Sequence, residues 1–281
     1  MNHSTISMLG AVGLALVTST ASAQCLDANA PVATYEVTFV ADWSQATHPA
    51  GFPGNPHFSP LIGGTHTGAV TFWEPGGIAT PGIERMAETG SPTILRGEVQ
   101  AAVDADTAGS VLQGGGIGSS PGQVSLAFDI DEDFPLITLV TMIAPSPDWF
   151  VGVHGMPMRD GNGWLPTIEV DLWAYDSGTD SGANYTSPNQ NTNPAEPIHN
   201  ISDQSPFAGT GRIGRLVFTQ TGPGAFPDIA EPCGQLNFFD VSAYITAFSN
   251  GDPSADIAAP FGQLNFFDVS AFITAFSNGL P

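Results

Sequence analysis

The sequence predicts an all-β sandwich followed by a small module of two loop–helix repeats. Three observations predict this mainly β class. Between residues 33 and 220, several segments alternate apolar and polar side chains with the period of a half-buried strand. Gly and Pro contribute 33 and 24 of the 281 residues, which disfavours long helices and favours turns. Near the C-terminus, residues 228–251 recur as residues 256–279.

The predicted strands follow one another along the first part of the chain. Alternation runs through residues 34–41, 124–130 and 168–172, as expected for strands with one buried face. Leu136–Ala144 is almost continuously apolar, which predicts a central strand that is buried on both faces. We therefore expect a sandwich domain over residues 33–220.

Turn-rich segments separate these strands. Loops rich in Gly, Pro, Asn and Ser are expected at residues 49–60 and 182–197, at the ends of the sandwich. One short helix is expected at Gly82–Thr89. Residues 221–227 are expected to form a linker to the C-terminal module.

The C-terminal module is an internal duplication with a period of 28 residues, in which three of 24 positions differ. In the first copy Val241, Tyr244, Ile245 and Phe248 recur at i, i+3, i+4 and i+7, which predicts one face of an amphipathic helix. Two units of this size are expected to pack against each other, because neither buries its apolar face alone. We assign residues 228–281 to this module.

The charge balance excludes two classes of partner. The chain has 27 acidic residues and five basic ones, so its formal net charge is −22. A nucleic-acid-binding surface needs a basic stripe that displaces counterions, and five scattered arginines do not provide one. An anionic membrane surface would repel the chain for the same reason.

The N-terminal segment has the pattern of a secretory signal peptide. A short apolar run at Met8–Val17 precedes Ala21-Ser22-Ala23, a small-residue cleavage signature. We expect residues 1–23 to be removed, which predicts a secreted or cell-surface protein. No later segment is long and apolar enough to be expected to cross a membrane.

Cys25 and Cys233 are the two cysteines of the chain. In an oxidising compartment such a pair either forms a disulfide or remains as two thiols. Sequence spacing says nothing about the geometry that a disulfide requires, so both alternatives stay open at this point.

Two glycine motifs match catalytic or cofactor patterns but do not fit their context. Gly118–Gly122 has the G-x-S-x-G spacing of serine hydrolases, but Pro121 follows the serine and has no N–H for an oxyanion. Gly209–Gly214 has the G-x-G-x-x-G spacing, but it precedes a predicted strand instead of opening a helix. Both are interpreted as turns.

Three histidines, His48, His57 and His66, are spaced nine residues apart. Three imidazoles could in principle hold zinc. Their segment is rich in Pro and Gly, and we interpret them instead as structural residues that bond loop backbone.

Aspartates in two loops are better candidates for a cation site. Asp148 follows the buried strand 136–144, whereas Asp176 and Asp180 follow the strand that begins at residue 168. Loop aspartates and backbone carbonyls supply the oxygen ligands that calcium prefers. The alternative is that these residues cap turns through Asx hydrogen bonds, and spacing alone favours that alternative.

Many short motifs between residues 33 and 220 occur together in one order. They are Tyr35-Glu36-Val37-Thr38-Phe39, Trp43-Ser44, Thr47-His48-Pro49, His57–Gly64 with His66, Phe72-Trp73-Glu74, Gly76-Gly77, Ala87–Pro92, Pro145–Val151, Tyr175–Gly182, Ser187-Pro188-Asn189 and Pro194–Ile198. In this set and order the region resembles the spondin N-terminal domain family.

The resemblance implies an eight-stranded antiparallel β-sandwich and an adhesion or matrix role without catalysis. It also implies that Asp148, Asp176 and Asp180 are calcium ligands, because they match the family's S-P-D-W and Y-D-x-G-T-D-S-G motifs. The chain lacks the domain cysteines of its animal relatives, which leaves the disulfide pattern open.

The repeats resemble the dockerin-like repeats of secreted bacterial proteins. Weak metal ligands are expected at Asp228, Asn237, Asp240, Asp256, Asn265 and Asp268. The first and fourth of these fall one residue too early for a calcium loop, and the middle ligands are replaced by Ala, Pro, Phe or Cys. We interpret the repeats as an attachment or partner-docking tail.

The leading hypothesis is a secreted, non-enzymatic, calcium-binding adhesion module with a docking tail. Its partner would be an extracellular or cell-surface protein or glycan. One alternative is a secreted hydrolase that uses the acidic loop end on a polysaccharide or ester. A second alternative is a structural matrix component that needs no metal.

Overall fold

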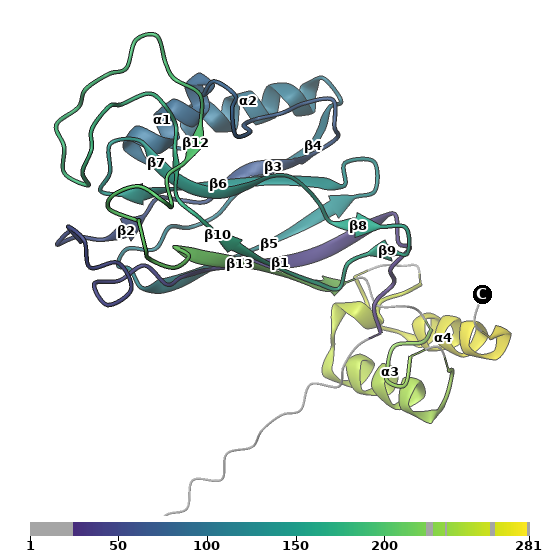
Figure 1. Ribbon diagram of the computed structural model, residues 1–281. Coiled ribbons are helices and arrows are strands. Elements are labelled where there is room, and N and C mark those ends of the chain that lie inside the picture. Colours follow the sequence, from purple (N-terminus) through teal and green to yellow (C-terminus); the bar gives the residue numbers. More distant parts are fainter. Residues whose placement is uncertain (1–24, 223–226, 234, 259–261, 280–281) are drawn as a thin grey trace, which may run out of the picture. The chain divides into compact units, whose positions relative to one another are not determined.

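The computed structural model describes residues 25–222, 227–233, 235–258 and 262–279 (Figure 1). By contacts, the chain divides into two compact units: Leu26–Phe226 is the larger one, and the smaller one combines Pro227–Pro281 with the N-terminal residues up to Cys25. The expected signal peptide, residues 1–23, lies outside the described residues. No helix among the described residues is long and apolar enough to cross a membrane.

The larger unit contains thirteen strand segments and two helices in the described part of the chain. The strands are β1 (Val32–Ala41), β2 (His57–Phe58), β3 (Ile62–His66), β4 (Ala108–Gln113), β5 (Gly122–Asp131), β6 (Leu136–Ala144), β7 (Trp149–Pro157), β8 (Arg159–Asp160), β9 (Gly163–Trp164), β10 (Thr167–Leu172), β11 (Tyr175–Asp176), β12 (His199–Asn200) and β13 (Gly214–Gly222). The helices are α1 (Pro81–Thr89) and α2 (Thr93–Asp104).

Eleven of the thirteen strands form two sheets whose paired neighbours are antiparallel, and β8 pairs with β9 as a separate two-stranded sheet. One sheet has the order β10-β13-β1-β5, and the other has the order β12-β11-β7-β6-β3-β4, with β2 beside β6. The mainly β class and a sandwich-like arrangement are therefore confirmed. The expected count of eight strands is not confirmed, because the described chain forms thirteen strand segments.

The main core lies between the two sheets. Side chains of β1 that alternate along the strand, Tyr35, Val37 and Phe39, are buried there with Leu139 of β6 and Phe218 of β13. The period-2 pattern of β1 thus reports its two faces, because successive side chains of a strand point to opposite sides.

Strand β6 is buried on both faces because a helical layer covers the larger sheet on the side away from the smaller sheet (Figure 1). Its Val140 packs in a second cluster with Ile83 of α1 and with Leu95 and Val99 of α2. The expected short helix is therefore present as α1. Helix α2 was not expected, although its buried Leu95, Val99 and Ala102 have helical spacing.

Helix α1 has local signals at both ends. The Thr80 side chain accepts a hydrogen bond from the Ile83 N–H, and Pro81 occupies the first turn. Gly90 ends the helix in the left-handed conformation, with φ 69°. These caps fix the last turn of α1, which carries Glu88.

The smaller unit contains α3 (Phe238–Asn250), the 3₁₀ turn η1 (Pro253–Ala255) and α4 (Phe266–Asn278). Tyr244 and Phe272, which occupy equivalent positions in the two copies, stack with ring centroids 4.1 Å apart. The expected apolar face is wrong in one position: Ile245 is 56% exposed, whereas Val241 and Phe248 pack on this core. The core that this face contacts includes Ala255 of η1 as well as Phe272 of α4.

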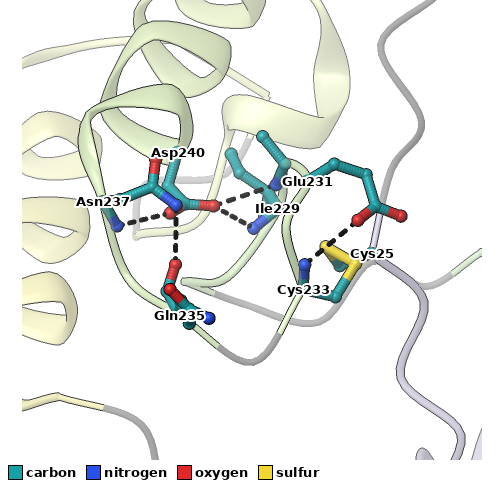
Figure 2. Close-up of a disulfide and its surroundings, with 8 residues drawn as sticks. Cys25, Ile229, Glu231, Cys233, Gln235, Asn237 and Asp240 are labelled. Atoms are coloured by element: carbon teal, nitrogen blue, oxygen red, sulfur yellow. Dashed lines mark hydrogen bonds between the residues drawn. A yellow bond between two sulfur atoms is a disulfide. The ribbon is translucent and has the colours of Figure 1, made fainter.

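Cys25 and Cys233 are joined in the structure by a disulfide whose Cα atoms are 5.6 Å apart (Figure 2). The two residues are separated by 208 positions in the sequence and both belong to the smaller unit. The bridge therefore makes the start of the described chain part of the repeat module.

Candidate metal centre

The loop aspartates meet at one end of the larger sheet. Strand β11 pairs with the start of β7, in a register that places Asp176 opposite Trp149. Asp148 immediately precedes β7, so sheet pairing brings it beside the loop that follows β11. The backbone N–H of Ser177 donates to the Asp148 carbonyl oxygen, which ties the two loops together.

Asp148 is fully buried, and its two carboxylate oxygens differ. Oδ2 accepts from the Ser177 hydroxyl at 2.9 Å and from the N–H groups of Thr179 and Asp180 at 2.8 and 3.0 Å. Oδ1 is buried with no hydrogen-bond partner. Burial raises the pKa of Asp148 above its ordinary value, against the opposing effect of these hydrogen bonds.

Asp176 is held on both sides of its carboxylate. Oδ2 accepts from the Trp149 indole N–H at 3.2 Å, and Oδ1 accepts from the Gly178 N–H at 2.8 Å. Gly178 has φ +76°, and a Cβ there would lie 2.0 Å from the Glu196 carbonyl oxygen, so only glycine fits. Burial, followed by the neighbouring charge of Asp148, raises the pKa of Asp176 to about 6.

Asp180 is buried and organises the following loop. Its Oδ1 accepts from the Gly182 N–H at 2.7 Å, and its Oδ2 accepts from the Gln190 N–H at 3.0 Å. Both oxygens are therefore engaged by backbone, as in the Asx-type role considered from the sequence. Of the three expected ligands, Asp180 has the clearest structural task.

Glu88 is a fourth carboxylate that the sequence reasoning missed. It projects from the last turn of α1, and its Oε1 is buried without a hydrogen-bond partner. Burial raises its pKa, a hydrogen bond with Thr179 lowers it, and the charges of Glu84, Asp148 and Asp180 raise it further. The only signal was its place in the Ala87–Pro92 motif, because α1 is far from the acidic loops in sequence.

The described residues do not present a ready-made metal centre. Among them, no three His, Cys, Asp or Glu side chains converge closely enough to form one. Two unpartnered oxygens, Asp148 Oδ1 and Glu88 Oε1, are nevertheless buried in one acidic neighbourhood. A buried carboxylate oxygen without a donor is costly, and a cation would relieve that cost. This oxygen-only donor set fits calcium.

A cavity of about 300 Å³ adjoins this neighbourhood. Trp149, Asp176 and Asp180 contribute to its wall together with Glu196 and His199. The Trp149 ring packs against two other loop residues, since the centroids of Tyr185 and Phe207 lie 5.3 Å from it. The acidic loops therefore line an open cavity above a rigid aromatic base.

The three histidines that were considered as zinc ligands form hydrogen bonds with the backbone. His48, His57 and His66 each bond a backbone carbonyl, of Gly211, Asn55 and Thr67 respectively.

The serine of the hydrolase-like string is also engaged. The Ser120 hydroxyl donates to the Trp43 carbonyl oxygen at 2.7 Å, and the chain enters β5 directly afterwards.

The candidate ligands of the repeats lie in loops and at helix starts. Asn237 and Asn265 are N-caps of α3 and α4, and Asp240 and Asp268 complete their capping boxes. Asp256 Oδ2 accepts from the Gly262 N–H while Asp256 Oδ1 is buried without a hydrogen-bond partner, and Asp228 is buried. The six residues therefore belong to the two loop–helix junctions, three to each copy.

Comparison with known proteins identifies the larger unit. The family model described as Spondin_N matches residues 33–210. The chain therefore belongs to the spondin N-terminal domain family. Over 179 residues it is 34% identical to human Spondin-2, an alignment that covers 62% of this chain and 54% of Spondin-2. Over 188 residues it is 36% identical to mouse Spondin-1, covering 62% of this chain and 23% of Spondin-1.

These alignments cover only part of each relative. The chain spans about half the length of Spondin-2 and less than a quarter of that of Spondin-1. The match also stops short of the repeats, since it ends at residue 210. The family assignment consequently concerns the sandwich and not the tail.

Proposed function

We propose that this chain is a secreted adhesion or matrix-type binding protein whose sandwich holds calcium at its acidic loop end. The observation that carries the metal assignment is the pair of buried, unpartnered oxygens, Asp148 Oδ1 and Glu88 Oε1. Asp176 would complete the set as a third carboxylate, and Asp180 would hold the loop around it. The bound ion would neutralise charges that otherwise repel each other.

The adhesion role is supported by the family to which the sandwich belongs. A spondin N-terminal domain is expected to act by binding at the cell surface or in the matrix, and the cavity beside Asp176 offers an acidic surface for a ligand. The alternative of a hydrolase receives no support from the relatives, and Ser120 is engaged in the fold. We therefore propose a non-enzymatic protein.

The repeats would attach the protein to a partner. Phe238, Phe239, Phe266 and Phe267 are between 60% and 77% exposed, at equivalent positions of the two copies. Exposed apolar side chains that lie next to each other mark interaction surfaces, so these phenylalanine pairs are the proposed contact. The partner and any metal dependence of this attachment are separate from the calcium proposed for the sandwich.

Thermal unfolding of the full mature chain with calcium and with chelator tests the metal assignment. A ligand at about 100 times its dissociation constant adds about 2.7 kcal/mol, which corresponds to a rise of roughly 5–10 °C for a unit of this size. Glu88→Gln and Asp148→Asn should each abolish most of that rise. Because they remove repelling charge, both should also raise the midpoint measured in chelator.

Asp133→Asn is the matched control. Asp133 is an exposed aspartate of the β5–β6 turn, so its loss should leave the calcium-induced rise unchanged. An equal rise in wild type, Glu88→Gln and Asp148→Asn would refute the site.

A further inference from the structure

Each repeat contains a carboxylate that binds the backbone of its own loop. Asp240 Oδ1 accepts from the N–H groups of Ile229 and Ala230, both at 2.9 Å. Its Oδ2 accepts from the Asn237 N–H at 2.8 Å, so both oxygens are engaged (Figure 2). The side chain thus connects the beginning of the loop to the first turn of α3.

The second copy repeats this arrangement. Asp268 Oδ1 accepts from the N–H groups of Ile257 and Ala258 at 2.9 and 2.8 Å, and Oδ2 accepts from the Asn265 N–H at 2.8 Å. The network persists although the loops differ at the positions of Glu231 and Cys233. It is therefore independent of the disulfide, which only the first copy has.

The donor set does not fit the calcium ion that a dockerin-like loop implies. A twelve-residue calcium loop takes ligands from positions 1, 3, 5, 7, 9 and 12, with glycine at position 6. With Gly234 and Gly262 at the sixth position, the residues at positions 1, 3 and 5 are Ile229, Glu231 and Cys233 in one copy and Ile257, Ala259 and Phe261 in the other. Only one of these six side chains is a carboxylate, and Cys233 is in a disulfide.

The residue at position 12 of each loop also binds protein atoms. In a calcium loop the residue at position 12 gives its oxygens to the ion, whereas Asp240 and Asp268 give theirs to three N–H groups each. Hydrogen bonds from N–H groups to an ionised carboxylate are strong and directional. These hydrogen bonds hold the loop backbone around the carboxylate, as coordination would hold it around a calcium ion.

We propose that the repeats are metal-free modules, in which the carboxylates of Asp240 and Asp268 replace the calcium ion as the organising centre of each loop. The network also fixes the capping residues Asn237 and Asn265, which directly precede the exposed phenylalanine pairs. The tail therefore stays folded in chelator. If the repeats attach the protein as proposed above, attachment is independent of calcium, whereas ligand binding by the sandwich depends on it.

Hydrogen–deuterium exchange of the full mature chain tests this inference, with calcium and with chelator. For each of the peptides covering residues 228–240 and 256–268, the exchange rate in chelator should be within twofold of its rate in calcium. Peptides of the two copies differ in mass because Glu231 corresponds to Ala259 and Cys233 to Phe261. Clear slowing of exchange in either repeat on adding calcium would overturn the inference.

The same experiment separates this inference from the proposed calcium site. Peptides covering residues 145–151 and 175–182 should exchange more slowly with calcium if the sandwich binds it. Unchanged sandwich peptides would refute that site and leave the metal-free repeats standing. Calcium-dependent repeat peptides would refute the metal-free repeats whatever the sandwich does.

Asp240→Asn tests the role of the carboxylate, with the second copy as internal control. An asparagine keeps the shape but has one acceptor oxygen, so it loses the hydrogen bonds on one side of the carboxylate. Exchange either near Ile229 and Ala230 or at Asn237 should therefore accelerate about tenfold or more. Exchange near Ile257 should change little. If the variant unfolds both copies, the wild-type comparison in calcium and chelator still decides. Unchanged exchange at residues 229–230 and at residue 237 in a folded variant would show that the carboxylate does not organise the loop.

Discussion

Asp176 is a carboxylate whose protonated form the fold favours. Burial and the charge of Asp148 raise its pKa to about 6, whereas an unfolded aspartate titrates near 4. Between these values the folded chain binds more protons than the unfolded chain. This group therefore makes the metal-free protein more stable near pH 4, and that contribution is lost as the pH rises through about 6.

We predict that the unfolding midpoint in chelator falls by roughly 2–6 °C between pH 4.5 and 7 on account of this group. The high net negative charge of the chain contributes a slope of its own, so the test is the difference between wild type and Asp176→Asn. The variant should have the smaller slope, and calcium should flatten the slope of wild type. Equal slopes in chelator would contradict the assignment.

The role of each carboxylate depends on contacts that its position in the sequence does not reveal. The apolar pattern identified the strands before Asp148 and Asp176, but those strands, β6 and β10, lie in different sheets. The two aspartates meet because β11, a two-residue strand that the pattern did not predict, pairs with β7. The engagement of Asp180 by Gly182 and Gln190 was not predictable, nor was the approach of Glu88. The approach of Glu88 depends on how α1 lies over the larger sheet, whereas the contacts of Asp180 depend on how its own loop closes.

At the scale of elements, the two helices over the larger sheet explain the continuous apolar run of β6. Residues on alternate sides of β6, such as Leu139 and Val140, enter different clusters, one between the sheets and one under α1 and α2. The run predicted burial on both faces without saying what covers each face. Helix α2 escaped prediction because its interior Gly97 and its short apolar stripe are weak helix signals.

Helices α3 and α4 carry the exposed phenylalanine pairs, and their role is testable at this scale. We predict that changing all four residues to serine reduces retention of the full chain on envelopes of the producing cells at least tenfold. Each site is exposed, so the stability cost should stay within about 0.5 kcal/mol per substitution. The loss of retention would then reflect a lost contact and not unfolding.

The control for that variant is Ile78→Ser in the sandwich. Ile78 is 58% exposed, so its change removes an exposed apolar side chain outside the repeats. Equal loss of retention in both variants, or no loss in the four-site variant, would argue against an attachment surface on α3 and α4.

At the scale of the whole molecule, the disulfide decides what the smaller unit contains. Cys25 lies at the start of the described chain, and the disulfide joins it to Cys233 of the first repeat, 208 positions away in the sequence. We predict that Cys25→Ser with Cys233→Ser costs the smaller unit about 2–5 kcal/mol, because the cross-link restricts its unfolded state.

The tryptophans allow the two units to be followed separately. All five, Trp43, Trp73, Trp149, Trp164 and Trp173, belong to the larger unit, so their emission reports the sandwich alone. In urea, the tryptophan midpoint of the double variant should equal that of wild type, whereas exchange of residues 228–258 should accelerate. A lowered tryptophan midpoint would mean that the two units unfold together.

The sequence by itself determined the strand faces, the burial of β6, the duplication near the C-terminus and the family motifs of the acidic loops. These follow from local periodicity and order, which a single chain displays directly. Only the tertiary structure decided that Glu88 approaches the acidic loops, that Asp240 and Asp268 bind backbone N–H groups, and that Cys25 meets Cys233. Each of these depends on residues distant in sequence or on how loops close, and such contacts have no period that a sequence could reveal.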